Sequence, residues 1–176
     1  ESTSWDNTHS FGQARQAYAT QANRSYGQAK QEGRTNDALL PPRVVSPTRR
    51  LVILVIDVTG SMGGWPDTFF DKAPYLAHEV KTYLGEGAYI MICAHGDARC
   101  DTPEDFPSQI RPPSGDRESL KTSLTEIVHT KGGGGQMMET SELIGLYLRD
   151  NLELPDGDEK QIVVFITDEK PYPSIS

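Results

Sequence analysis

Apolar residues gather in three short stretches of the chain, 51–56, 88–94 and 161–167, the last of which is apolar between Gln161 and Thr167. The first run, Leu-Val-Ile-Leu-Val-Ile, is unbroken and rich in β-branched residues. Runs of this length and composition predict strands that are buried on both faces, as in a parallel sheet. A shorter edge strand is expected near 108–111, inside an irregular, proline-rich stretch over 95–116.

The segments between these runs have helical patterns, which predict helices over 66–84, 117–130 and 138–152. Pro66 suits the start of the first helix and Gly85 its end, whereas Pro74 predicts a kink or a break inside it. Alternating strands and helices predict an α/β fold with a doubly wound, mostly parallel sheet. Because so few strands would leave an edge uncovered, we expect part of the fold to lie C-terminal to this sequence.

The first 50 residues have a different character. Small apolar and aromatic residues recur every three or four positions over 11–29, which predicts a thin helical stripe of Ala and Tyr. The prolines of 33–50 predict an extended connector. The chain is therefore divided into a polar N-terminal segment, 1–50, and an α/β domain, 51–176.

Charge narrows the range of functions. The 176 residues carry a net charge of −8, which divides into +3 for residues 1–50 and −11 for residues 51–176. An acidic domain repels phosphate backbones, so we expect no nucleic-acid partner. No apolar run approaches the roughly 20 residues that span a bilayer, so we expect no membrane insertion. The two cysteines, Cys93 and Cys100, suggest neither a zinc site nor a disulfide framework, which favours a cytoplasmic protein.

Candidate ligands for a metal ion follow two of the predicted strands. Asp57, Thr59 and Ser61 come directly after the first strand, and Asp168 comes directly after the third. The carboxyl ends of parallel strands meet at one edge of a sheet, where ligands bind. Carboxylate and hydroxyl oxygens suit a hard cation such as Mg²⁺, with Mn²⁺ or Ca²⁺ as alternatives, better than zinc or copper.

The pattern Asp57-x-Thr59-x-Ser61 resembles the metal-ion-dependent adhesion site of von Willebrand factor type A (VWA) domains. That family's first loop reads Asp-x-Ser-x-Ser, and Thr is a conservative change at the middle position. Asp168 matches the Asp of the family's third loop. The resemblance implies a doubly wound, Rossmann-like sheet, with a metal ligand also supplied by a second loop.

The second loop departs from the usual family pattern. Residues 132–143 read Gly-Gly-Gly-Gly-Gln-Met-Met-Glu-Thr-Ser-Glu-Leu, which is similar to a little-characterised branch of the superfamily. The same branch shares further motifs, which together cover about 51–173; they lie at 57–66, 70–74, 96–98 and 168–173. The resemblance implies Glu139 or Thr140 as the second-loop ligand, with Gln136 as a third candidate. Alternatively, Glu139 only occupies a first helical turn, where a carboxylate meets the helix dipole favourably.

Other polar residues are expected to have lesser roles. His95, Asp97 and Asp101 follow the second strand, and we interpret them as loop residues around the crevice. His78 and His129 fall within predicted helices and are expected at the surface or at helix ends. Cys93 is expected to be buried in a strand, with Cys100 in a loop.

The resemblance implies a binding module rather than an enzyme. A bound Mg²⁺ would complete its six oxygen ligands with an Asp or Glu side chain of a protein partner. One alternative is a Mg²⁺-dependent phosphohydrolase with Asp57 as nucleophile. Against it, phosphatases resembling haloacid dehalogenases have a second Asp where this chain has Thr59. A second alternative is a scaffold in which the metal has only a structural role.

Overall fold

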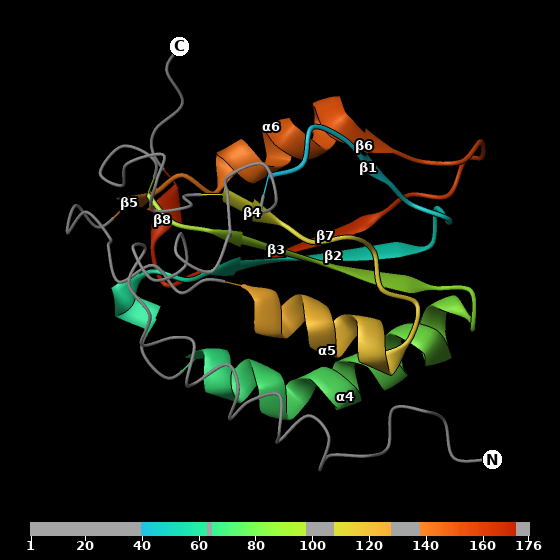
Figure 1. Ribbon diagram of the computed structural model, residues 1–176, viewed down its shortest axis with the longest axis horizontal. Coiled ribbons are helices and arrows are strands. Elements are labelled where there is room, and N and C mark those ends of the chain that lie inside the picture. The colour runs from blue at the N-terminus through green and yellow to red at the C-terminus, as the bar shows by residue number, and fades with distance from the viewer. Residues whose placement is uncertain (1–39, 63–64, 98–107, 128–137, 172–176) are drawn as a thin grey trace.

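The computed structural model describes residues 40–62, 65–97, 108–127 and 138–171, which form an α/β fold (Figure 1). The largest strands and helices are those expected from the sequence pattern. The elements are β1 (Val44–Val45), β2 (Leu51–Asp57), the 3-10 turn η1 (Gly60–Met62), α4 (Trp65–Leu84), β3 (Tyr89–His95), β4 (Ser108–Ile110), α5 (Arg117–Glu126), β5 (Met138–Glu139), α6 (Glu142–Asn151), β6 (Leu152–Glu153), β7 (Ile162–Ile166) and β8 (Lys170–Pro171).

The main sheet has four strands in the order β4-β3-β2-β7. β3 and β7 both run parallel to β2, and β4 is antiparallel to β3. The register pairs Asp57 with His95 on one side of β2 and Ile56 with Ile166 on the other. Because β2 is followed by β3 on one side and joined later by β7 on the other, strand order reverses beside its carboxyl end. Ligands bind at such a reversal in open α/β sheets.

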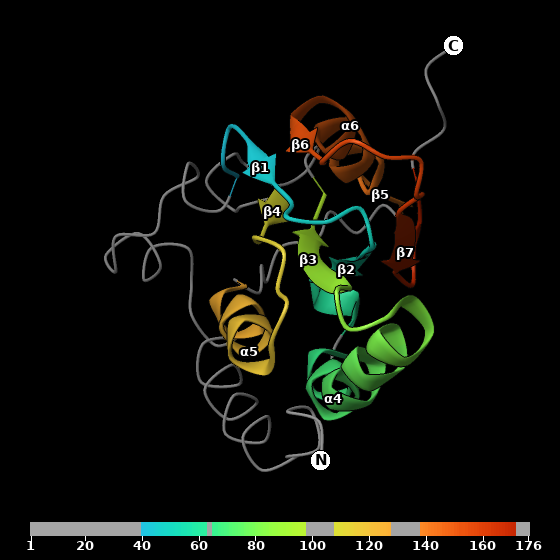
Figure 2. The ribbon, with the colours of Figure 1, turned by 90° about the vertical axis from the view of Figure 1, so that its right-hand side faces the viewer.

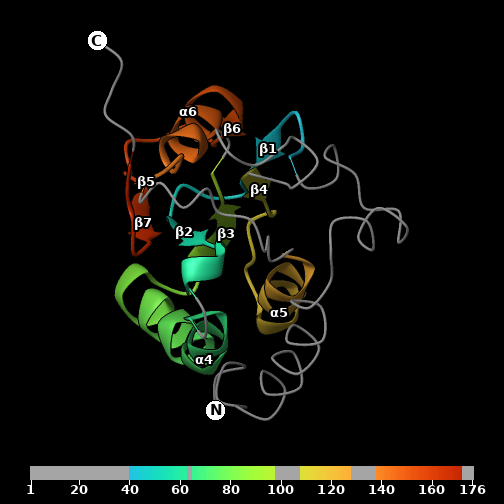
Figure 3. The ribbon, with the colours of Figure 1, turned by 90° about the vertical axis from the view of Figure 1, so that its left-hand side faces the viewer.

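Helices cover both faces of this sheet (Figures 2 and 3). Side chains of β2 alternate between the faces, since successive residues of a strand point in opposite directions. Val52, Leu54 and Ile56 pack in a cluster with residues of α4 and α5. Leu51, Ile53 and Val55 pack in a second cluster with residues of α6. All seven residues of β2 are buried, so this strand is the centre of the domain.

The helix α4 presents its small apolar residues to the sheet. Ala73, Ala77 and Val80 are buried at spacings of four and three residues, which places them on one helix face. The helix runs without a break through Pro74, so of the predicted kink or break, the break is wrong. It ends at Gly85, as predicted, where a backbone φ of +88° suits glycine and the amide donates to the Lys81 carbonyl.

Two expected boundaries differ in the structure. Residues 138–139 form the strand β5 rather than the start of a helix, and α6 begins only at Glu142. The cause is tertiary: Met138 and Glu139 pair in parallel with Lys170 and Pro171 of β8. Also, α5 ends at Glu126, because Ile127 takes an extended conformation.

The expected connector contains a short strand. Val44 and Val45 of β1 pair with Leu152 and Glu153 of β6, in a two-stranded parallel sheet. The helix predicted over 11–29 lies outside the described residues. No helix within the described ranges has the length and apolar character needed to cross a bilayer.

Asp116 caps the first turn of α5, and its substitution gives a pH-dependent prediction. Its carboxylate accepts a hydrogen bond from the Ser119 amide, which lowers the pKa of the carboxyl group. The stabilisation is therefore present above the ordinary carboxyl pKa and is lost as pH falls through the lowered one. We expect Asp116→Ala to cost about 1 kcal/mol at pH 7 and less at pH 3, measured by urea unfolding. An equal cost at both pH values would contradict this prediction.

Candidate functional site

Asp57 is the centre of a hydrogen-bonded cluster at the carboxyl edge of the sheet. It is the last residue of β2 and is fully buried. One carboxylate oxygen, Oδ1, accepts hydrogen bonds from the Thr59 amide at 2.8 Å and from the Thr59 hydroxyl at 2.6 Å. The other, Oδ2, accepts from the Thr167 hydroxyl at 2.9 Å. The structure therefore brings Asp57 and Thr59 together, and it adds Thr167.

Thr167, rather than Asp168, meets Asp57 because of strand alternation. Ile56 and Ile166 are paired neighbours, so the next residues along each strand, Asp57 and Thr167, point to the same face of the sheet. Asp168 is one residue further, and its side chain is exposed. Sequence reasoning missed Thr167 because its role depends on the register between β2 and β7.

Thr140 is at the same edge of the sheet. It precedes α6, is buried, and its hydroxyl donates a 3.1 Å hydrogen bond to the carbonyl of Gly96, directly after β3. Glu139 is in β5, so the alternative of a carboxylate in a first helical turn is wrong; its side chain lies outside the described atoms. Of the two second-loop candidates, Thr140 is therefore the one that the structure shows hydrogen-bonded at the end of β3.

His95 lies closer to the centre of the candidate site than expected from the sequence. It is the register partner of Asp57, is fully buried, and neither of its ring nitrogens has a hydrogen-bond partner among the described residues. Burial lowers its pKa, against the opposing effects of nearby Asp57 and Glu142. A neutral imidazole therefore lies beside the Asp57 carboxylate. Asp97, two residues along, is also buried.

The structure says less about the other residues that the sequence singles out. Ser61 lies in the turn η1, which begins directly after Thr59, but the Ser61 side chain lies outside the described atoms. Gln136, Asp101, His129 and Cys100 lie outside the described residues. His78 is exposed on α4, as expected. Cys93 is buried in β3, also as expected, and burial raises the pKa of its thiol, so it is protonated and unreactive at neutral pH.

The side chains at this edge of the sheet present hydroxyl and carboxylate oxygens, which are the ligand atoms that a hard cation prefers. The Thr59 and Thr167 hydroxyls give their protons to Asp57, which leaves these oxygens as acceptors only, and the Thr167 oxygen also accepts a hydrogen bond from the Glu169 amide at 3.1 Å. Among the described residues, no three His, Cys, Asp or Glu side chains group closely enough to hold an ion. An ion at this edge would therefore need hydroxyl oxygens and water as well as carboxylates, as Mg²⁺ accepts.

Comparison with known proteins gives no assignment. No protein-family model matches the chain, and no curated protein matches it significantly. The cluster around Asp57 and the sequence motifs are therefore the features that point to a function.

Proposed function

We propose that residues 51–176 form a VWA-like, doubly wound domain that binds a divalent cation, with Mg²⁺ as the first candidate. Its ligands would be Thr59, Ser61 and Thr140, with Asp57 and Asp168 supplying negative charge. The single observation that carries the proposal is the buried Asp57 carboxylate, held by hydroxyls from the segments that follow β2 and β7. A protein with no ligand to bind would have little reason to bury a charge at a strand-order reversal.

The cation would serve to recognise an acidic side chain of a protein partner. Mg²⁺ keeps several waters in protein sites, and a carboxylate can replace one of them. The partner carboxylate would otherwise approach a domain with a net charge of −11, so a bridging cation offsets the repulsion. Thr140 is the better second-loop candidate, because its buried hydroxyl is held at the end of β3.

Binding is favoured over phosphohydrolysis by the surroundings of Asp57. An aspartate nucleophile needs a carboxylate oxygen that is open to the phosphorus atom. Here Oδ1 accepts two hydrogen bonds and Oδ2 accepts one, all from the protein, and the side chain is fully buried. These contacts suit a group that orients its neighbours rather than one that attacks a substrate.

A metal titration of the whole chain tests the proposal. Isothermal titration with MgCl₂ or MnCl₂ should detect one ion per chain, and Mg²⁺ at about 100 times its Kd should add about 2.7 kcal/mol to the free energy of unfolding. EDTA should reverse this gain. With Mn²⁺ bound, acetate serves as the carboxylate probe and should lower the relaxation rate of water protons as it displaces a bound water.

Three other outcomes of these experiments would each favour a different conclusion. A bound ion whose water relaxation does not respond to acetate would favour a structural metal. Hydrolysis of 4-nitrophenyl phosphate with Mg²⁺, lost in Asp57→Asn, would favour the enzyme. Absence of any bound ion would overturn the proposal.

A further inference from the structure

In the described part of the chain, His95 is the buried side chain whose polar atoms all lack a hydrogen-bond partner. It is the last residue of β3, it is fully buried, and neither Nδ1 nor Nε2 makes a hydrogen bond. Arg111 and Arg117 also leave one buried nitrogen, Nε, without such a bond, but each forms an ion pair with a glutamate. Because burying an imidazole without partners costs free energy, its position indicates a bound ligand or a bound water.

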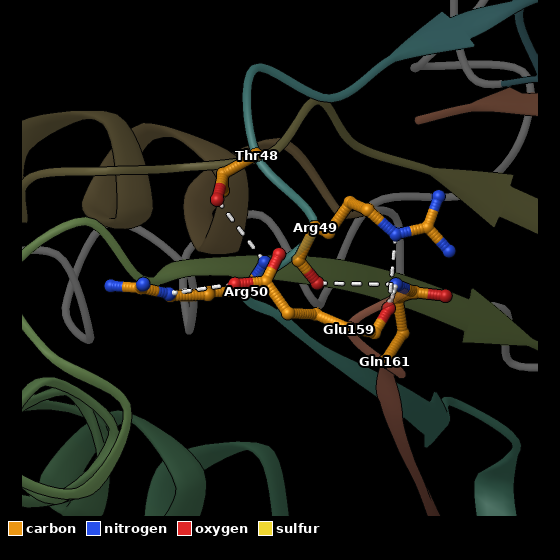
Figure 4. Close-up of polar contacts among 5 residues, drawn as sticks. All are labelled: Thr48, Arg49, Arg50, Glu159 and Gln161. Carbon is orange, nitrogen blue, oxygen red and sulfur yellow. Dashed lines mark hydrogen bonds and ion pairs between the residues drawn. The ribbon is translucent and has the colours of Figure 1, made fainter. Parts of the chain in front are cut away.

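Polar side chains at the opposite end of the sheet are paired within the chain (Figure 4). At the amino ends of β2 and β7, Arg49 Nε donates to the Glu159 carbonyl at 3.0 Å, and Gln161 Nε2 donates to the Arg49 carbonyl at 3.2 Å. The Glu159 carboxylate forms an ion pair with Arg50 at 3.4 Å. These groups are exposed or half-buried and would be solvated without each other. The imidazole at the carboxyl edge, in contrast, has neither a protein partner nor access to bulk water.

His95 and Asp57 point to the same face of the sheet. They are register partners in neighbouring parallel strands, which lie about 4.8 Å apart. Side chains two and four residues before them pack in one cluster on the α6 face; they are Cys93, Met91, Val55 and Ile53. Since side chains alternate along a strand, His95 and Asp57 extend this same face. The imidazole and the carboxylate can therefore contact one ligand.

Both groups have an acceptor position that no described atom fills. Oδ2 of Asp57 accepts one hydrogen bond, from Thr167, although a carboxylate oxygen can accept two. Burial lowers the pKa of His95, so the imidazole is neutral and one of its nitrogens carries a lone pair. A cation satisfies both lone pairs at once. The second ring nitrogen of a histidine ligand usually donates to a carbonyl, a carboxylate or a water.

We propose that His95 supplies a nitrogen ligand to the cation at this edge, so that the site prefers Mn²⁺ to Mg²⁺. This inference rests on the proposed function, because it adds a ligand to the same site. Mg²⁺ takes oxygen ligands, whereas the divalent ions of the first transition row also bind imidazole. The hydroxyl and carboxylate oxygens around Asp57 keep the preference with Mn²⁺ rather than with zinc or copper.

Pulsed electron paramagnetic resonance of the whole chain with bound Mn²⁺ tests this ligand. A nitrogen bound directly to Mn²⁺ modulates the electron spin echo, and labelling histidine with ¹⁵N changes the modulation frequency without changing the protein. We expect a nitrogen modulation in the unchanged chain, a changed frequency after labelling, and loss of the modulation in His95→Gln. His78→Gln is the matched control, because His78 is exposed on α4 and should keep the modulation.

Metal affinities give a second measurement of the same ligand. His95→Gln replaces the imidazole by an amide, whose oxygen Mg²⁺ accepts as readily as Mn²⁺ does. The change should weaken Mn²⁺ binding on the order of 10-fold and Mg²⁺ binding by less than about 3-fold. The ratio of the two Kd values, from isothermal titration, separates this effect from a loss of folded protein, which would weaken both ions alike.

A third variant decides the matter if His95→Gln fails to fold. Replacing the other three histidines, His9, His78 and His129, by glutamine leaves His95 as the only histidine of the chain. A modulation that this variant keeps, and that ¹⁵N-histidine shifts in frequency, would come from His95.

Three results would overturn the inference. A bound Mn²⁺ without a nitrogen modulation would leave the proposed function intact but would remove His95 from the ligands, with a water between the imidazole and Asp57 instead. A modulation that persists in His95→Gln would belong to a different nitrogen. If no ion binds at all, this inference and the proposed function both fail.

Discussion

Replacing Asp57 by alanine is expected to abolish divalent-cation binding and to destabilise the domain. The substitution removes the acceptor of three hydrogen bonds, from the Thr59 amide, the Thr59 hydroxyl and the Thr167 hydroxyl. A buried donor that loses its acceptor costs about 1–3 kcal/mol, and the cost is smaller for the Thr167 hydroxyl, which also donates to the Glu169 carbonyl at 3.2 Å. We expect a net loss of about 2–4 kcal/mol in the free energy of unfolding. Urea unfolding in the absence of metal measures this loss of stability separately from the loss of cation binding.

The isosteric variant Asp57→Asn separates charge from folding. Its amide oxygen can still accept from Thr59, so most of the stability should remain, while the lost charge should weaken Mg²⁺ binding on the order of 100-fold. Asp156→Asn is a matched control, because Asp156 is an exposed acidic residue between β6 and β7. Equal Mg²⁺ affinities for Asp57→Asn and the unchanged chain would remove Asp57 from the site.

The second large effect is expected in the core on the α6 face. Ile144 of α6 is fully buried and packs in the cluster with Ile53 and Val55 of β2. Ile144→Ala removes buried methyl and methylene groups and leaves a cavity, so it should cost about 2–5 kcal/mol in the free energy of unfolding. Urea unfolding should show a lower midpoint with an unchanged m-value.

The same helix supplies the control for this substitution. Leu146 is 45% exposed and lies on the opposite side of α6 from Ile144. Leu146→Ala should therefore change the free energy of unfolding by only about 0.5 kcal/mol. If both variants lost stability equally, α6 would not be packed on the sheet through Ile144.

The main sheet could be predicted from the sequence because its signals are local. Buried strands need apolar residues at every position, and β2, β3 and β7 each lie within one residue of a predicted run. The expected burial on both faces is met by β2 but is wrong for β7, where Ile162 to Phe165 are 38–46% exposed. The strand β5 has no such signal, since its two residues are extended only through pairing with β8. Helix propensity could not reveal a partner 32 residues further along the chain.

The candidate site could be predicted in position but not in detail. Asp57 and Thr59 follow a strand that sequence alone could place. The role of Thr167 depends on the pairing of Ile56 with Ile166, and the role of His95 on its pairing with Asp57. Such registers are set by packing between distant segments, and a one-residue slip would point each side chain to the other face.

The central position of β2 also bears on how the protein fluctuates. β2 has a strand on either side and a packed cluster on either face, so its amides should open to solvent only when the whole domain unfolds. Strands at the edges of the sheet can open through local motions that need less free energy than unfolding of the whole domain. We therefore expect the Asp57 carboxylate to be attached to the slowest-exchanging strand of the described residues, so that its orientation persists through local opening elsewhere in the sheet.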